Sequence, residues 1–235
     1  MFALFLLLAL VVACHAGHKE DAMLQAWPTS FFTKFYSNIT TDQFMTPDLS
    51  SYPISAKMYY RYDENVKAQK VEHDAGTIEC AKFYNSEQPC TLYFLPEGLY
   101  RVLQTPLPKD TTQTCCLDME GLGPTPPDFM FKSAITFDGM IRDYSNNNLL
   151  GEQFSFDSDN GNPHRYVQVS PTHPVYGKQP LIFTFPAANG LQDYHFIVES
   201  MDTSRAIEES VFELPQGCRY QKCIVPPESK QNKKE

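Results

Sequence analysis

The residues best suited to chemistry in this sequence are a histidine–aspartate pair and the cysteines. Asp193 and His195 stand two positions apart, so their side chains share one face if the segment is a β-strand. Such a pair beside a free cysteine would suit thiol catalysis. The alternative is a satisfied polar pair on a β-surface. We favour it because every cysteine of the exported chain has a candidate partner, and we expect no catalytic residues and no enzymatic activity.

Metal and cofactor sites need ligands at characteristic spacings, which this sequence does not provide. The loop Asp157–Asn162 resembles a calcium loop, but glycine stands fifth in it and Gln168 occupies the twelfth position. An EF-hand requires glycine sixth and glutamate twelfth. The short cysteine and histidine pairs of zinc sites, the nucleophile elbow, the Walker loop and the dinucleotide fingerprint are missing. We expect no metal and no cofactor.

The first residues have the layout of a secretory signal peptide. Phe2–Ala13 is an unbroken apolar run of 12 residues, too short to cross a bilayer as a helix. Small residues follow, and we expect cleavage near Ala16. Val11–Cys14 also fits a bacterial lipoprotein cleavage site loosely. The mature chain is therefore expected to be secreted, extracellular or in the lumen of the secretory pathway. The sequon Asn38-Ile39-Thr40 is consistent with a glycoprotein.

Six of the seven cysteines follow the expected cleavage point, and an even number in a secreted chain predicts three disulfides. Cys115 and Cys116 would point to opposite faces of a strand, so they are expected to bond to different partners. A bond from the 80–116 region to the 218–223 region would close a loop of roughly 100 residues, worth about 4–5 kcal/mol. The six cysteines are Cys80, Cys90, Cys115, Cys116, Cys218 and Cys223.

Composition excludes several classes of protein. The chain has 235 residues, 42% of them apolar, with 18 prolines, 11 glycines and a net charge of −9. It is neither collagen-like nor disordered, and it lacks the basic face that nucleic-acid binding requires. Acidity also disfavours attachment to anionic membranes. Because the basic face is missing, we expect no nucleic-acid binding. No second long apolar stretch follows the signal segment, so we also expect no stable membrane insertion.

Short strand patterns separated by turn residues dominate the chain from Ala56 onward. Lys57–Tyr62 and Val66–His73 flank a turn-like cluster and predict a hairpin. About ten such segments predict an all-β, mainly antiparallel fold with one or two short helices, in parts of residues 22–37 and 203–210. Asp138–Gly139 is predicted to be a turn, and residues 211–214 a last short strand.

We therefore expect four regions along the chain: a signal peptide at 1–16, a partly helical or irregular segment at 17–54, a single β domain at 55–225 and a disordered tail at 226–235.

Aromatic residues are concentrated on the strand candidates, and core packing accounts for some of them. Large aromatics on a curved sheet leave a concave apolar surface. We therefore predict a curved, half-open barrel of about ten strands whose pocket binds a hydrophobic small molecule or lipid. The alternatives are an adhesive or matrix domain and an accessory domain related to secreted proteases. The candidate pocket residues are Tyr60, Tyr62, Tyr93, Phe94, Tyr100, Phe154, Phe156, Tyr166, Phe183, Phe185, Tyr194 and Phe196.

The order of several motifs resembles a known family. Met58–Asp63 (MYYRYD) is followed by Leu92–Tyr100 (LYFLPEGLY), the cysteine doublet, a Pro-Pro segment that leads to Ala134 and Gly139, and a late cysteine pair. Over roughly residues 55–223 this layout resembles the ependymin-related secreted glycoproteins. The resemblance implies a deep half-barrel similar to the bacterial lipoprotein carrier fold, with a hydrophobic pocket and a tendency to form homodimers.

The same resemblance implies a disulfide pattern. By analogy with the family, Cys90 would pair with Cys223 and Cys116 with Cys218, which leaves Cys80 for Cys115. The chain departs from the family in two respects. It has no tryptophan in its second half and no early cysteine in residues 17–79.

Overall fold

The structure is a computed structural model. It describes residues 24–40, 55–77, 79–80, 88–103, 114–132, 134–157, 163–187, 190–218 and 222–223. The predicted signal peptide, most of the loop that resembles a calcium site, and the predicted tail lie outside the described residues. The predictions made for those segments remain predictions.

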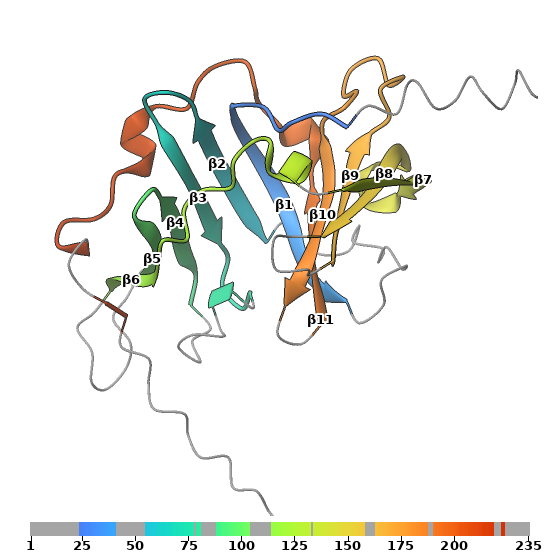
Figure 1. The fold of residues 1–235 in the computed structure, drawn as a ribbon. Helices are drawn as coiled ribbons and strands as arrows, with labels where there is room; N and C mark the ends of the chain where they lie inside the picture. Colours follow the sequence, from blue (N-terminus) through green and yellow to red (C-terminus); the bar gives the residue numbers. More distant parts are fainter. Residues whose placement is uncertain are drawn as a thin grey trace, which may run out of the picture. The chain divides into compact units, whose positions relative to one another are not determined.

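Eleven strands form the fold, and every pairing with a described register is antiparallel (Figure 1). The hydrogen-bonding order is β6-β5-β4-β3-β2-β1-β11-β10-β9-β8-β7, so β6 and β7 end the ladder and it is not closed. The predicted all-β, antiparallel class is confirmed. The strands are β1 (Ser30–Thr40), β2 (Ala56–Tyr62), β3 (Lys67–His73), β4 (Cys90–Leu95), β5 (Gly98–Leu103), β6 (Cys115–Glu120), β7 (Ile135–Asp143), β8 (Leu149–Asp157), β9 (Pro163–Val169), β10 (Pro180–Ala187) and β11 (Gly190–Phe196).

The helical elements with described bounds are short 3-10 turns. Residues 211–214, predicted to be a strand, instead overlap one of these turns, and most of residues 203–210 are irregular. Both predictions were wrong because Phe212 packs into the core as a single buried side chain, so neither a strand nor a longer helix is needed. The turns are η2 (Phe129–Lys132), η3 (Tyr144–Asn146), η4 (Val198–Ser200) and η5 (Glu209–Phe212).

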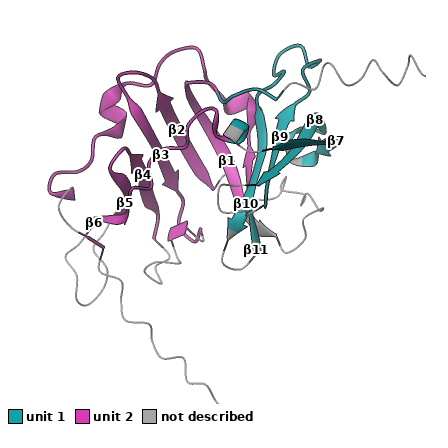
Figure 2. Ribbon diagram, viewed as in Figure 1, with its two compact units in different colours: residues 1–27, 39–50, 130–193 teal, residues 28–38, 51–129, 194–235 magenta. Residues whose placement is uncertain are grey.

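The chain divides into two compact units, each built from three separate stretches of sequence (Figure 2). Unit 1 comprises residues 1–27, 39–50 and 130–193, and unit 2 comprises residues 28–38, 51–129 and 194–235. The described strands β7 to β10 belong to unit 1 and β2 to β6 to unit 2. Most of β1 belongs to unit 2, and both β1 and β11 contribute residues to each unit. The single β domain predicted for 55–225 remains a prediction.

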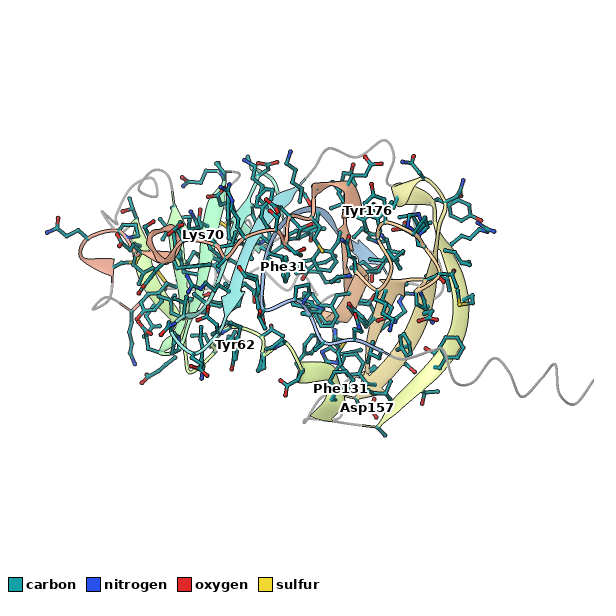
Figure 3. The ribbon with its side chains drawn as sticks, turned by 90° about the horizontal axis from the view of Figure 1, so that it is seen from above. Phe31, Tyr62, Lys70, Phe131, Asp157 and Tyr176 are labelled. Carbon is teal, nitrogen blue, oxygen red and sulfur yellow. A yellow bond between two sulfur atoms is a disulfide. The ribbon has the colours of Figure 1, made fainter. Side chains whose placement is uncertain are left out.

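Unit 2 contains a strand that the sequence analysis missed. The region 17–54 was predicted to be partly helical or irregular, but residues 30–40 form β1, which pairs with β2. Phe31, Thr33 and Phe35 are buried and alternate with less buried neighbours, which is the period of a strand. Aromatic and β-branched side chains favour that conformation. Phe31 is labelled among the side chains in Figure 3. Its ring stacks on that of Tyr60 of β2, with centroids 4.9 Å apart.

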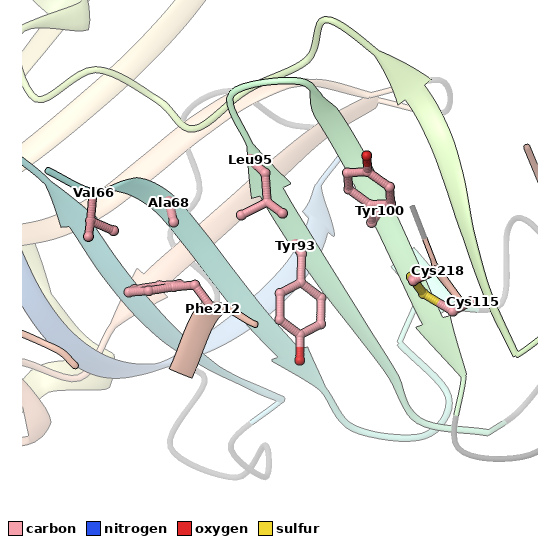
Figure 4. Packing of buried hydrophobic residues seen from close by; sticks show 8 residues of the cluster. All are labelled: Val66, Ala68, Tyr93, Leu95, Tyr100, Cys115, Phe212 and Cys218. Atoms are coloured by element: carbon pink, nitrogen blue, oxygen red, sulfur yellow. A yellow bond between two sulfur atoms is a disulfide. The ribbon is translucent and has the colours of Figure 1, made fainter. Parts of the chain in front are cut away.

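One face of the unit 2 sheet is covered by the C-terminal segment. Phe212 of η5 lies against β3 and β4, close to Ala68 and Tyr93 (Figure 4). Cys115 and Cys218 belong to the same buried cluster and are joined by a disulfide. This face therefore has an apolar core that residues 207–218 cover.

Unit 1 contains a four-stranded portion of the sheet in which the strand register separates two kinds of side chain. In β8, Phe154 and Phe156 alternate with Gln153 and Ser155, and β9 and β10 continue this division. In β7, Asp138 was predicted to be part of a turn, which was wrong. Phe137 pairs with Phe154 and Gly139 with Gln153, so Asp138 is the extra residue of a β-bulge. Gly139 has a φ of 124°, a conformation that favours glycine.

Candidate functional site

Aromatic rings gather on one face of the unit 1 sheet, which we call the aromatic face, and their contacts form two groups. Phe137 contacts Phe154 with centroids 5.5 Å apart. Farther along the strands, His164 stacks between Phe156 and Phe183 at 5.4 and 5.9 Å. Phe183 also contacts Phe185 at 5.5 Å. The aromatic face consists of Phe137, Phe154, Phe156, His164, Tyr166, Phe183 and Phe185.

The aromatic face is only partly covered. Phe154, Phe156 and Tyr166 are buried, whereas Phe183 and Phe185 are half-buried. Phe137, on the terminal strand β7, is 45% exposed. Because the exposure of the rings increases along this face, an apolar molecule can contact the more exposed rings without displacing the buried ones.

The one tryptophan of the sequence, Trp27, lies at this face. Its ring meets that of Phe183 edge-on, with centroids 6.1 Å apart, and Trp27 is itself buried. Burial raises the pKa of Tyr166, and the neighbouring Trp27 partly offsets that effect. Trp27 was not among the predicted pocket residues, although a lone tryptophan in a chain with phenylalanine-rich strands was a usable signal.

The twelve predicted pocket residues are divided between the two units. Phe154, Phe156, Tyr166, Phe183 and Phe185 belong to unit 1 and share the aromatic face. The other seven belong to unit 2, and core packing accounts for part of them. Tyr93 and Tyr100 are buried in the cluster under Phe212. The remaining five are Tyr60, Tyr62, Phe94, Tyr194 and Phe196.

Within unit 2, four of these five residues have described ring contacts or hydrogen bonds. Tyr60 and Tyr62 stack with centroids 6.4 Å apart, and the Tyr60 hydroxyl donates a hydrogen bond to the Thr125 carbonyl at 2.7 Å. Phe35 contacts Tyr194 at 4.6 Å and Phe196 at 5.9 Å. Burial raises the pKa of Tyr60 far above its ordinary value. These contacts describe a packed interior.

A buried charged cluster lies on the opposite face of the unit 2 sheet from Tyr93, and the sequence analysis missed it. Arg101 of β5, which is 1% exposed, donates to the Asp118 carboxylate at 2.7 Å and to the Glu79 carbonyl at 2.6 Å. The Glu79 carboxylate accepts a hydrogen bond from the Ser37 hydroxyl at 2.7 Å. Its other oxygen lies 3.7 Å from Nδ1 of His73. These hydrogen bonds and charge pairs connect β3, β5 and β6 with residue 79.

His73 makes the stability of the protein depend on pH. Burial lowers the pKa of His73, Arg101 lowers it further, and the carboxylates of Glu79 and Asp74 partly oppose this. Below about pH 6.5 the unfolded chain binds a proton that the folded protein resists, so stability falls with decreasing pH. The expected slope from this group is up to about 1.4 kcal/mol per pH unit. Urea unfolding of wild type and His73→Gln between pH 7 and 5 checks this: the variant should lose part of the slope, and equal slopes would contradict it.

The predicted disulfide partners were wrong, although all six cysteines form the expected three disulfides. Cys80 pairs with Cys90, Cys115 with Cys218 and Cys116 with Cys223. Strand neighbours explain the first bond, because Cys90 lies opposite Leu103 and packs with it against Cys80. Three disulfides indicate an oxidising compartment. As predicted, the adjacent Cys115 and Cys116 have different partners.

The Asp193–His195 pair is entirely buried rather than placed at a solvated surface. Asp193 lies 3.5 Å from the guanidinium of Arg165. Within the described ranges, no group of three or more His, Cys, Asp or Glu side chains is arranged to hold a metal ion. Asn38 of the sequon lies within β1. No helix among the described residues is both long enough and apolar enough to span a bilayer.

The fold and the disulfides define the protein as an all-β protein, antiparallel in every described strand pair and cross-linked by three disulfides. No family model and no curated protein matches its sequence. An uncharacterized conserved protein from Thermus thermophilus is similar in structure, with a TM-score of 0.45 and 9% identity, over 83% of this chain and 90% of that one. LprF from Mycobacterium bovis is similar with a TM-score of 0.33 and 11% identity, over 71% of this chain and 84% of LprF.

Proposed function

We propose that this is a secreted, non-enzymatic protein that binds a hydrophobic, lipid-like molecule against the aromatic face of unit 1. The observation that carries the proposal is the exposure gradient along that face. Buried rings at Phe154 and Tyr166 are continued by half-buried rings at Phe183 and Phe185. A ligand that covers the half-buried rings would gain roughly 25 cal/mol for each Å² of apolar surface removed from water. The three disulfides support passage through an oxidising compartment.

Substitution of the half-buried rings is expected to weaken binding of an apolar probe. Phe183 contacts Trp27, His164 and Phe185, so it is the most connected ring of the face. For Phe183→Ala we expect the affinity for N-phenyl-1-naphthylamine to fall at least tenfold, since about 1.4 kcal/mol of lost contact is a factor of ten. Fluorescence titration of the full chain, with displacement by oleic acid, measures this.

Gln153→Ala is the matched control, because Gln153 lies on β8 with its side chain on the opposite face of the same sheet. It should bind the probe like wild type. Near-ultraviolet circular dichroism establishes that both variants remain folded. If folded Phe183→Ala and wild type bind the probe equally, the ligand does not lie on the aromatic face. If no fatty acid displaces the probe from wild type, the proposed ligand class is wrong.

A further inference from the structure

A polar cavity lies beside Ser155 and Arg165 of the unit 1 sheet, and His164 of the aromatic face is also part of its lining. Its volume is about 470 Å³, which falls within the roughly 300–1,000 Å³ typical of small-molecule sites. Its lining includes polar side chains from four neighbouring strands, and Leu191 of β11 adds an apolar one. Asp138, Ser155, Arg165 and Thr184, which we call the polar row, stand side by side across β7 to β10.

The polar row is held in place by its own hydrogen bonds. The Ser155 hydroxyl donates to Oδ1 of Asp138 at 3.0 Å, and the Gln153 amide donates to Oδ2 at 3.3 Å. Nε of Arg165 donates to the Thr184 hydroxyl at 3.1 Å. The bulge in β7 is what directs Asp138 toward Gln153 and Ser155. Because these side chains are already ordered, a ligand that meets them loses little of its binding energy to their immobilisation.

The charges of the site disfavour an anionic ligand. Among the described residues of the lining, Arg165 supplies the positive charge, and the buried carboxylate of Asp193 lies 3.5 Å from it. Asp138 adds a second, exposed carboxylate to the lining. The lining and its support thus carry one positive and two negative groups, so a phosphate or carboxylate gains no net attraction.

The hydrogen-bonding groups match a molecule that both donates and accepts. The Asp138 carboxylate accepts, the Arg165 guanidinium donates, and the Gln153 amide and Ser155 hydroxyl do both. Hydroxyl groups have the same dual capacity, and the carbon skeleton of a sugar can lie against Leu191. We propose that this cavity is a binding site for a neutral polyhydroxylated ligand, a mono- or disaccharide, and that it is distinct from the apolar site although His164 borders both.

The test is a titration of the isotopically labelled full chain with glucose, galactose, mannose, N-acetylglucosamine and lactose. The side-chain amide signals of Gln153 report on the cavity directly. At least one sugar is expected to shift them saturably in the millimolar range. Asp138→Ala, observed through the Ser155 and Arg165 backbone signals, should weaken that binding at least tenfold. Arg142→Ala, on the same strand β7 but outside the lining, should leave it unchanged.

Three outcomes would overturn the proposal. The first is that none of the five sugars binds saturably, and the second is that Asp138→Ala binds as tightly as wild type. The third is that inorganic phosphate or acetate shifts the Gln153 signals while the sugars do not, because this would identify an anion site. Phe183→Ala should bind the sugar normally, since Phe183 belongs to the opposite face. Failure here is therefore distinguishable from failure of the proposed apolar site.

Discussion

Removal of both long-range disulfides is expected to cost about 7 kcal/mol, whereas removal of either one alone should cost only about 2 kcal/mol. Cys115–Cys218 and Cys116–Cys223 span 103 and 107 residues and therefore close almost the same loop. When one of these bonds is present, the chain near residues 115–116 is already held to the chain near residues 218–223. The other bond then closes a loop of only a few residues. The first closure carries about 4.7 kcal/mol of chain entropy and the second about 2 kcal/mol. A loss of about 7 kcal/mol equals or exceeds the stability of many domains. A variant in which all four of these cysteines are replaced by alanine should therefore be unfolded.

Urea unfolding of two paired alanine variants and of the quadruple alanine variant measures this coupling. Each paired variant removes one bond. In the first, Cys115 and Cys218 are both replaced by alanine, and in the second, Cys116 and Cys223 are both replaced by alanine. Removal of Cys80–Cys90, which spans 10 residues, is the independent comparison and should cost about 2.7 kcal/mol. Two large and additive losses from the paired variants would show that the bonds do not share a loop.

Asp118→Ala is expected to destabilise the protein by about 3–5 kcal/mol, because it leaves the charge of Arg101 buried without its carboxylate. Arg101 is almost fully buried, and its pairing distance to Asp118 is 2.7 Å. Replacing both residues together, Arg101→Met with Asp118→Leu, should cost less than Asp118→Ala alone, since neither member of this ion pair is left buried without the other. Thermal and urea unfolding monitored by circular dichroism give both values.

Glu120→Ala is the matched control for this prediction. Glu120 lies on the same strand as Asp118, but its ion pair with Lys222 is at the surface, with both side chains mostly exposed. Exposed ion pairs contribute little, so its substitution should leave the unfolding midpoint nearly unchanged. If Asp118→Ala were as mild as Glu120→Ala, the buried cluster would not stabilise unit 2.

Local patterns that agreed with one another were predicted well. In the hairpin of β2 and β3, a β-prone segment, a polar turn and a second alternating segment all indicated the same structure. In β1, the aromatic doublets Phe31-Phe32 and Phe35-Tyr36 satisfy both helical spacing and alternation. Only pairing with β2 decides in favour of the strand. Asp138–Gly139 is likewise a signal for a turn and for a bulge, and its strand neighbours decide which one forms.

The site depended on information that a single sequence does not contain. Aromatic density was visible, but adjacent residues such as Tyr93 and Phe94 point to opposite faces of a strand. Tyr93 thus joins the closed core, and only register separates it from its neighbour. Disulfide partners depend on which distant strands become neighbours, and a family analogy could not replace that information. Polar residues such as Gln153 and Ser155 looked like ordinary strand positions until pairing brought them beside Asp138.

The central proposal concerns an apolar ligand on the aromatic face, and Trp27 provides the most direct measurement of it. Trp27 is the one tryptophan of the chain and lies against Phe183. Bromine quenches indole fluorescence only at close range, so titration with dibrominated stearic acid reports binding beside this ring. We expect saturable quenching that unbrominated stearic acid reverses and that Phe183→Ala weakens at least tenfold. Unchanged Trp27 fluorescence at saturating brominated lipid would contradict the proposal.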